Sequence, residues 1–315
     1  MTTVAMSTPV KLTVTTLLIS VVSCRQMPSG PGSQGDGRVR RFDKPGVEDF
    51  TGTLRPDANT ILLVTDSMTF RRVSPRKDGT NAVNYFMLET EVTNEMYARY
   101  LNATKRAKGD QERAKQEGRR REKMRLTGAY FGSTAAPIYD FKNVSLLWNG
   151  NTPPRGRKQF PVAFLTIGDA KEFCQWLTSR YPQAGCFRLP TVQEWVFAAY
   201  GETRKYPWGD ERDLTVPCVS LSAKDLRTTP TPVKTHAKDR TPEGIYDLGG
   251  NVAEFVLDLK VLSFDTRWMG ASFKTYPFGK EGHPFKPRND YWGYCHGAAS
   301  RMEDIGFRVL LELTE

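Results

Sequence analysis

Two carboxylates, Asp247 and Glu254, flank the turn-forming run Gly249-Gly250-Asn251. Glycine has no side chain, so the backbone of such a turn can approach a ligand closely. A hard cation such as Ca²⁺ prefers several oxygen ligands, typically carboxylates mixed with carbonyls. The spacing therefore favours an oxygen cage for calcium, although both acids could instead cap turns and pair with arginine.

Few other residues are spaced for catalysis. The histidines, His236, His283 and His296, are scattered, and no two stand at a helical spacing for metal ligands. The sequence contains no glycine-rich phosphate loop and no recognisable Ser-His-Asp arrangement. Cys174 and Cys186 flank the expected end of a helix, so they either pair in a disulfide or remain buried free thiols.

Capping signals place the helices that must position these groups. Thr191 and Glu194 form a capping box before an apolar run, which predicts a helix over 192–200. Thr93 is expected to cap a second helix, and 167–177 reads as a third, amphipathic one. The residues expected to face the core from these last two helices are Tyr97, Tyr100, Leu101, Ala170, Phe173, Cys174 and Leu177.

Short β-branched and aromatic runs predict strands at 60–64, 69–73, 256–264 and 306–311. The sequence contains no internal repeat that would indicate more than one copy of a domain. The composition, with 39% hydrophobic and 25% charged residues, is typical of a globular protein that buries a core. We therefore expect one α+β domain over 56–315.

Four motifs follow one another in the chain: Phe187-Arg188-Leu189-Pro190-Thr191, Tyr206-Pro207-Trp208-Gly209, Gly244-Ile245-Tyr246-Asp247-Leu248-Gly249-Gly250-Asn251-Val252-Ala253-Glu254-Phe255 and Asp304-Ile305-Gly306-Phe307-Arg308. Together they resemble the formylglycine-generating enzyme family, whose members are also called sulfatase-modifying factors. The resemblance implies a single compact domain with a C-type-lectin-like core and little regular secondary structure. It also implies a strand at 160–166.

The same resemblance implies a calcium ligand set. It assigns the side chains of Asp247 and Glu254, and the backbone carbonyls of Gly250 and Val252, to one ion. The family has a second calcium site in the preceding loop, but its Asn is not evident here, and Asp225 is the only candidate remnant.

The resemblance also locates the family's catalytic copper centre, whose two cysteines are missing from this sequence. The family's oxidase binds copper(I) through two cysteines, five residues apart, just after a Gly-Gly-Ser motif. Aligned on Gly270-Ala271-Ser272-Phe273, those positions fall near Thr275 and Lys280. Copper(I) is a soft ion that prefers thiolates, which neither residue offers, and Cys295 stands alone. The sequence therefore argues against copper, and its scattered histidines argue against the iron site of related sulfoxide synthases.

The N-terminal residues are expected to export and anchor the chain. Lys11 precedes an apolar run, 12–22, that is too short to span a bilayer permanently. The run ends at Val21-Val22-Ser23-Cys24, which resembles a bacterial lipobox, so we expect removal of a signal peptide, 1–23, and lipidation of Cys24. An ordinary signal peptide with an incidental cysteine is the alternative.

Acyl chains on Cys24 would make the membrane a partner and would place the protein in the bacterial envelope, at the outer membrane or cell surface. Residues 24–55, rich in Gly, Pro and Ser, are expected to form a flexible tether.

The net charge of +10 is concentrated in one stretch. Residues 105–125 contain ten Lys or Arg and four Asp or Glu. We interpret this stretch as a solvated insertion, at about 104–126, on the surface of the domain. A patch for anionic lipid, polysaccharide or nucleic acid is the alternative, although export fits poorly with nucleic acid, and no such partner is expected.

A possible recognition surface lies between residues 276 and 296. Rigid aromatics mixed with small polar side chains suit recognition, so we expect an unidentified protein or glycan ligand there. The alternative is that these aromatics pack into the core. The residues are Tyr276, Phe278, His283, Asn289, Asp290, Tyr291, Trp292 and Tyr294.

These observations predict an envelope-anchored, non-catalytic recognition or scaffold lipoprotein with a formylglycine-generating-enzyme-like domain. A divergent enzyme of the same oxidase family, using another set of residues, is one alternative. A structural component of a secretion or gliding machine is the other.

Overall fold

The computed structural model describes residues 47–49, 60–63, 66–73, 85–108, 110, 115–116, 144–211, 213, 215–219, 227–258, 265–275, 292–296 and 301–313. For 47–49, 144, 265–266 and 292–296 it describes the backbone alone. All of these residues belong to one unit, Gln34–Glu315. The expected signal peptide, Cys24 and most of the expected tether lie outside the described residues.

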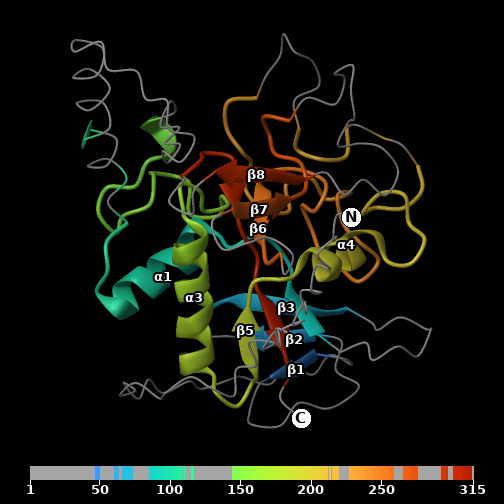
Figure 1. Cartoon of the computed structure of the whole chain (residues 1–315), viewed down its shortest axis with the longest axis horizontal. Helices are drawn as coiled ribbons and strands as arrows, with labels where there is room; N and C mark the ends of the chain where they lie inside the picture. Colours follow the sequence, from blue (N-terminus) through green and yellow to red (C-terminus); the bar gives the residue numbers. More distant parts are fainter. Residues whose placement is uncertain are drawn as a thin grey trace, which may run out of the picture. The chain divides into compact units, whose positions relative to one another are not determined.

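Six strands of the described chain form one sheet, in the order β1-β2-β3-β4-β10-β5 (Figure 1). The pairings are antiparallel, apart from the parallel pair β1 and β2. The C-terminal strand β10 therefore lies inside the sheet, between β4 and the edge strand β5. The bounds are β1 Val47–Asp49, β2 Thr60–Leu63, β3 Met68–Val73, β4 Tyr85–Leu88, β5 Cys186–Arg188 and β10 Leu310–Glu312.

A second sheet has the order β8-β7-β6-β9 among the described residues. Its strand β6 pairs antiparallel with β7 and parallel with β9, which places Glu254 opposite Met269 and beside Gly306. The sheet thus brings the acidic motif next to the C-terminal motif of the chain. The bounds are β6 Ala253–Val256, β7 Asp265–Met269, β8 Trp292–His296 and β9 Ile305–Gly306.

The three predicted α-helices are confirmed, together with their caps. They are α1 Asn94–Thr104, α3 Ile167–Arg180 and α4 Val192–Tyr200, and a short 3-10 turn, η2, covers Val144–Leu146. Thr93 accepts a hydrogen bond from the backbone N–H of Met96, and Thr191 and Glu194 form the expected capping box. Helices α1 and α3 lie side by side (Figure 1).

The predicted core faces are also confirmed. Tyr97 of α1 stacks on Phe173 of α3, with ring centroids 5.8 Å apart, and both rings meet Phe307 edge-on. These aromatic contacts join the helices to the C-terminal motif, because Phe307 is fully buried between β9 and β10.

Strands were predicted less accurately than helices. The expected strands at 60–64 and 69–73 correspond to β2 and β3. The expected strand at 160–166 is wrong: Pro161 forms only an isolated bridge with Thr93, and Phe164 has a left-handed φ of 56° that interrupts an extended chain.

Two strand boundaries also differ from expectation. The strand predicted to begin at Val256 instead ends there, as β6. The strand predicted over 306–311 is divided into β9 and β10, so that Phe307, Arg308 and Val309 form a connection between the two sheets.

The expectation of a fully solvated insertion at 104–126 is wrong at its beginning. Lys108 and Asp110 form an ion pair whose side chains are almost completely buried, and Lys108 also lies over the rings of Trp148 and Phe164. These two charges therefore attach the start of the insertion to the core. Most of the remaining insertion lies outside the described residues.

The sequence left a disulfide between Cys174 and Cys186 and buried free thiols open as alternatives, and neither holds for both residues. Cys174 is free and buried, as is Cys218, whereas Cys186 forms a disulfide, but with neither of these two. Burial raises the pKa of the Cys174 thiol, which therefore stays protonated.

Candidate functional site

The turn before β6 holds two non-glycine residues in the left-handed region, Asp247 with φ 62° and Asn251 with φ 67°. Between them, Gly250 packs so closely that an added Cβ would lie 2.7 Å from the carbonyl oxygen of Cys218. Only glycine fits here without displacement of the backbone. The turn places the buried Asp247 carboxylate so that it accepts a 2.8 Å hydrogen bond from the N–H of Lys234.

Glu254 and Arg308 form a buried ion pair beside this turn. The Arg308 guanidinium donates from Nε to Oε2 and from Nη2 to Oε1 of Glu254, at 2.7 and 2.6 Å. The indole of Trp195, from α4, donates a third hydrogen bond of 2.7 Å to Oε2. The exposed fractions of the Arg308 and Glu254 side chains are 0% and 1%. The arginine pairing left open by the sequence is therefore present for Glu254.

A further buried acid lies close to this pair. Glu91, two residues before the α1 cap Thr93, is fully buried, and neither of its carboxylate oxygens accepts a hydrogen bond from the residues that the structure describes. Burial, and next the charge of Asp247, raise the pKa of Glu91, whereas Arg308 lowers it. Burial and the same neighbouring charge also raise the pKa of Asp239. Four buried carboxylates thus share one buried guanidinium.

This excess of buried acid is compatible with a hard cation. A buried carboxylate stays charged only beside a cation, and Glu91 accepts no hydrogen bond within the described part of the chain. Its raised pKa favours the protonated acid unless a cation binds beside it. The carbonyls of Gly250 and Val252, the backbone ligands expected for calcium, belong to the same buried turn. Glu254, by contrast, already accepts three hydrogen bonds, so Asp247 and Glu91 are the better-placed carboxylates.

The position expected for the first copper thiolate is occupied by a closed hydroxyl turn. Thr275 Oγ1 accepts a 2.8 Å hydrogen bond from the N–H of Ser272, and the N–H of Thr275 donates to the carbonyl of Ser272 at 2.8 Å. The Ser272 hydroxyl in turn donates to Asp304 Oδ2 at 2.9 Å. The side chains at this turn are therefore hard oxygen groups. The second expected position, Lys280, lies outside the described residues.

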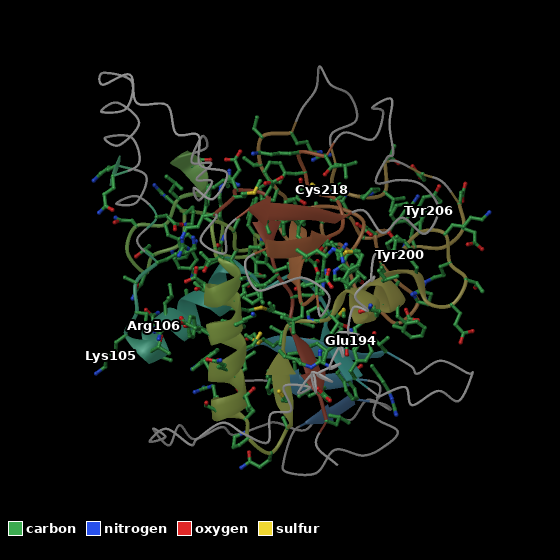
Figure 2. All side chains as sticks on the ribbon, in the orientation of Figure 1. Lys105, Arg106, Glu194, Tyr200, Tyr206 and Cys218 are labelled. Carbon is green, nitrogen blue, oxygen red and sulfur yellow. The ribbon has the colours of Figure 1, made fainter. Side chains whose placement is uncertain are left out.

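Cys218, labelled in Figure 2, packs against Phe273, two residues before Thr275. It forms a small apolar cluster with Val252 and Phe273 and has no exposed surface. Burial raises its pKa, so the thiol is a poor source of thiolate. The described residues contain no group of three or more His, Cys, Asp or Glu side chains arranged around a metal.

The predicted recognition surface lies mostly outside the described residues. Trp292 and Tyr294 lie on β8, where the backbone alone is described, and the other members, between 276 and 291, lie outside the described residues. In the part of the chain that is described, no helix has the length and apolar character needed to cross a membrane.

Sequence reasoning missed Glu91, Asp239 and the role of Arg308. Glu91 stands directly before the Val-Thr-Asn run that caps α1, and Arg308 ends the C-terminal motif. Arg308 belongs to the C-terminal motif and Glu91 lies near the Thr93 cap, but neither feature indicates that these side chains lie near the acidic turn. The pairing of Glu254 with Arg308, for example, spans 54 residues.

Comparison with known proteins gives one family match and several similar folds. The model of the "Sulfatase-modifying factor enzyme 1-like domain" matches residues 52–313. The inactive C-alpha-formylglycine-generating enzyme 2 of Bos taurus is 37% identical over 59 residues, which is 18% of this chain and 17% of that protein. The chain therefore matches only a small part of that relative's length.

Two solved structures are similar over most of the chain. PvdO from Pseudomonas aeruginosa has a TM-score of 0.53 and 16% identity, covering 81% of this chain and 98% of PvdO. CarF has a TM-score of 0.48 and 20% identity, covering 75% of this chain and 89% of CarF. At these identities, the PvdO match establishes a shared fold alone.

Proposed function

We propose that this chain, which belongs to the sulfatase-modifying factor family, is a non-catalytic recognition or scaffold protein. We also propose that it is anchored in the bacterial envelope. The observation that carries this proposal is the hydroxyl turn at Thr275. A copper(I) oxidase requires a pair of thiolates, and the turn offers Thr275, Ser272 and Asp304 instead.

The neighbouring thiol does not replace the missing pair. Cys218 is buried against Phe273, and its raised pKa keeps it protonated at neutral pH. Thiolate is also the form that would react as a nucleophile, so the same burial disfavours a thiol-based enzyme of another kind.

A structural calcium ion is the second part of the proposal. The carboxylates of Asp247 and Glu91 and the carbonyls of Gly250 and Val252 would hold the ion, while Glu254, the other expected ligand, stays paired with Arg308. Calcium supplies positive charge where buried carboxylates outnumber the one guanidinium. These residues come from the segment before α1 and from the turn before β6, so the ion would link two parts of the fold.

Calcium binding predicts a stability change that does not depend on any activity. An ion that binds only the folded state raises the unfolding temperature, so removal of calcium with EGTA should lower it. Glu91→Gln and Asp247→Asn should each reduce this difference, whereas magnesium should restore little of it. An unfolding temperature that is equal with EGTA and with calcium would contradict the ion.

Attachment to the membrane through Cys24 and recognition through residues 276–296 complete the proposal. The lipobox-like sequence supports the first, and the mixture of aromatic and small polar residues supports the second. The partner would be a protein or a glycan. Mass spectrometry of the mature N-terminus should detect an acylated Cys24, and an unmodified cysteine there would contradict the anchor.

The non-catalytic assignment is tested by oxygen consumption. Purified protein with copper and a cysteine peptide from a sulfatase should consume no oxygen above the rate in buffer. Turnover would instead favour a divergent enzyme, and Cys295→Ser would then reveal whether that thiol contributes. Co-purification with ring-forming envelope proteins would favour a component of a secretion or gliding machine.

A further inference from the structure

A cavity of about 460 Å³ opens in the segment between η2 and α3. Its volume lies within the range of small-molecule sites, roughly 300–1,000 Å³. It shares no residue with the acidic turn or with the hydroxyl turn at Thr275. The lining residues are Leu147, Asn149, Thr152, Pro153, Pro154, Arg155, Gly156 and Lys158.

Hydrogen bonds hold the walls of this cavity in place. The backbones of Asn149 and Thr152 exchange two hydrogen bonds, of 3.1 and 2.9 Å. The carbonyl of Pro154 accepts from the N–H of Arg157, and the carbonyl of Lys158 accepts from the N–H of Glu95 at the start of α1. A wall fixed at both ends is preorganised, so little entropy is lost when a ligand binds.

The chemistry of the lining is divided between an apolar interior and a cationic rim. Leu147 is buried, and the rings of Pro153 and Pro154 are half-buried, so they offer an apolar contact surface. Arg155 and Lys158 are exposed at the rim. In the described part of the chain, neither cation forms an ion pair with a carboxylate.

Arg157, directly before Lys158, also forms no ion pair with any acid that the structure describes. Arg157 lies over the ring of Phe160, with its guanidinium carbon 4.7 Å from the ring centroid, and its Nη1 is buried without an acceptor. Three cations thus lie within four residues, and no described carboxylate forms an ion pair with any of them. Together they create a local positive potential.

We propose that this cavity binds a small organic anion, a phosphate or sulfate monoester with an apolar body. The apolar body would contact Leu147 and the two proline rings, and the head would accept hydrogen bonds from Arg155 and Lys158. Guanidinium groups match the paired oxygens of phosphate and sulfate, and charge-assisted hydrogen bonds are the stronger ones. Asn149 and Thr152 supply further polar contacts for orientation.

Isothermal titration calorimetry with the full chain tests this site. The Cys24→Ser form is used, because it carries no acyl group that would bind vesicles by itself. Phenyl phosphate and phenyl sulfate are the probes, and inorganic phosphate and benzyl alcohol test the head and the apolar body separately. We expect saturable binding of at least one ester, with weaker binding of both partial probes.

Charge reversal of the rim provides the decisive comparison. Arg155→Glu with Lys158→Glu should weaken binding about 10-fold or more, because two charge-assisted hydrogen bonds are lost. Lys171→Glu with Lys205→Glu makes the same change of net charge at exposed positions outside the cavity and should leave affinity unchanged. The absence of saturable binding, or an equal loss in this control, would overturn the proposal.

Vesicles of phosphatidylcholine with phosphatidylglycerol distinguish two sources of the anion. Sedimentation with these vesicles that phenyl phosphate competes away would identify a lipid headgroup. Binding of the soluble ester without sedimentation would identify a free small anion. Either result supports the site, whereas vesicle binding that is unchanged by the rim reversal would contradict it.

Discussion

The ion pair between Arg308 and Glu254 offers the sharpest test of the fold. Arg308→Met keeps most of the side-chain volume but removes both hydrogen bonds to the carboxylate and those to the carbonyls of Leu88 and Tyr246, at 3.3 and 3.0 Å. Glu254 would then remain as a buried charge beside the already unpartnered Glu91. Breaking a buried pair in this way costs about 3–5 kcal/mol.

Urea unfolding, followed by tryptophan fluorescence, measures this loss. The matched control is Arg106→Met, because Arg106 pairs with Glu172 at the surface, where both side chains are about half exposed. The control should change the free energy of unfolding by no more than about 1 kcal/mol. Adding Glu254→Gln to Arg308→Met should recover part of the loss, since it removes the stranded charge.

A loss below about 1 kcal/mol in Arg308→Met would refute this reasoning. It would mean that the pair contributes no more than a surface pair, and that the buried excess of acid is compensated in another way. An equal loss in Arg308→Met and Arg106→Met would have the same consequence.

Three further predictions concern Lys108, Gly250 and Thr275, and all are measured by urea unfolding. Burial lowers the pKa of Lys108 to about 8, so the unfolded chain binds this proton more tightly. The free energy of unfolding should therefore rise by about 2 kcal/mol between pH 8 and 10, and Lys108→Met should remove that rise. Gly250→Ala should cost about 1–3 kcal/mol, because its Cβ would press on the backbone of Cys218, and no loss would contradict the close packing. Thr275→Val should cost about 1 kcal/mol and Thr275→Ser almost nothing, because serine keeps the hydroxyl that accepts from Ser272; equal losses would contradict the turn.

The helices could be predicted from the sequence because their signals are local. Thr191 and Glu194 lie three residues apart and form a capping box. Thr93 likewise stands directly before the helix that it caps. The apolar faces followed from helical periodicity, which is why Tyr97 and Phe173 were placed in the core correctly.

The errors arose where distant parts of the chain decide the outcome. The segment at Phe164 has the composition of a strand, but its carbonyl accepts hydrogen bonds from Lys108 and Arg301, and its backbone is left-handed. Lys108 itself lies in a charge run that is typical of a solvated surface, since composition does not reveal which charges turn inwards.

The acidic site was predicted only in part, because some of its residues are close in sequence and others are distant. The carboxylates of the turn, Asp247 and Glu254, are close in sequence, so their proximity was visible. Glu91 and Arg308 reach them only through the order of the two sheets, which no local pattern contains.

Copper stoichiometry tests the central claim most directly. The full chain is titrated with copper(I) under reducing conditions and desalted, and bound copper is measured by metal analysis, with X-ray absorption to identify the ligands. Because hydroxyl groups stand at the thiolate position, we predict no retained copper and no copper–sulfur signal. One copper per chain with two sulfur ligands would contradict a non-catalytic domain.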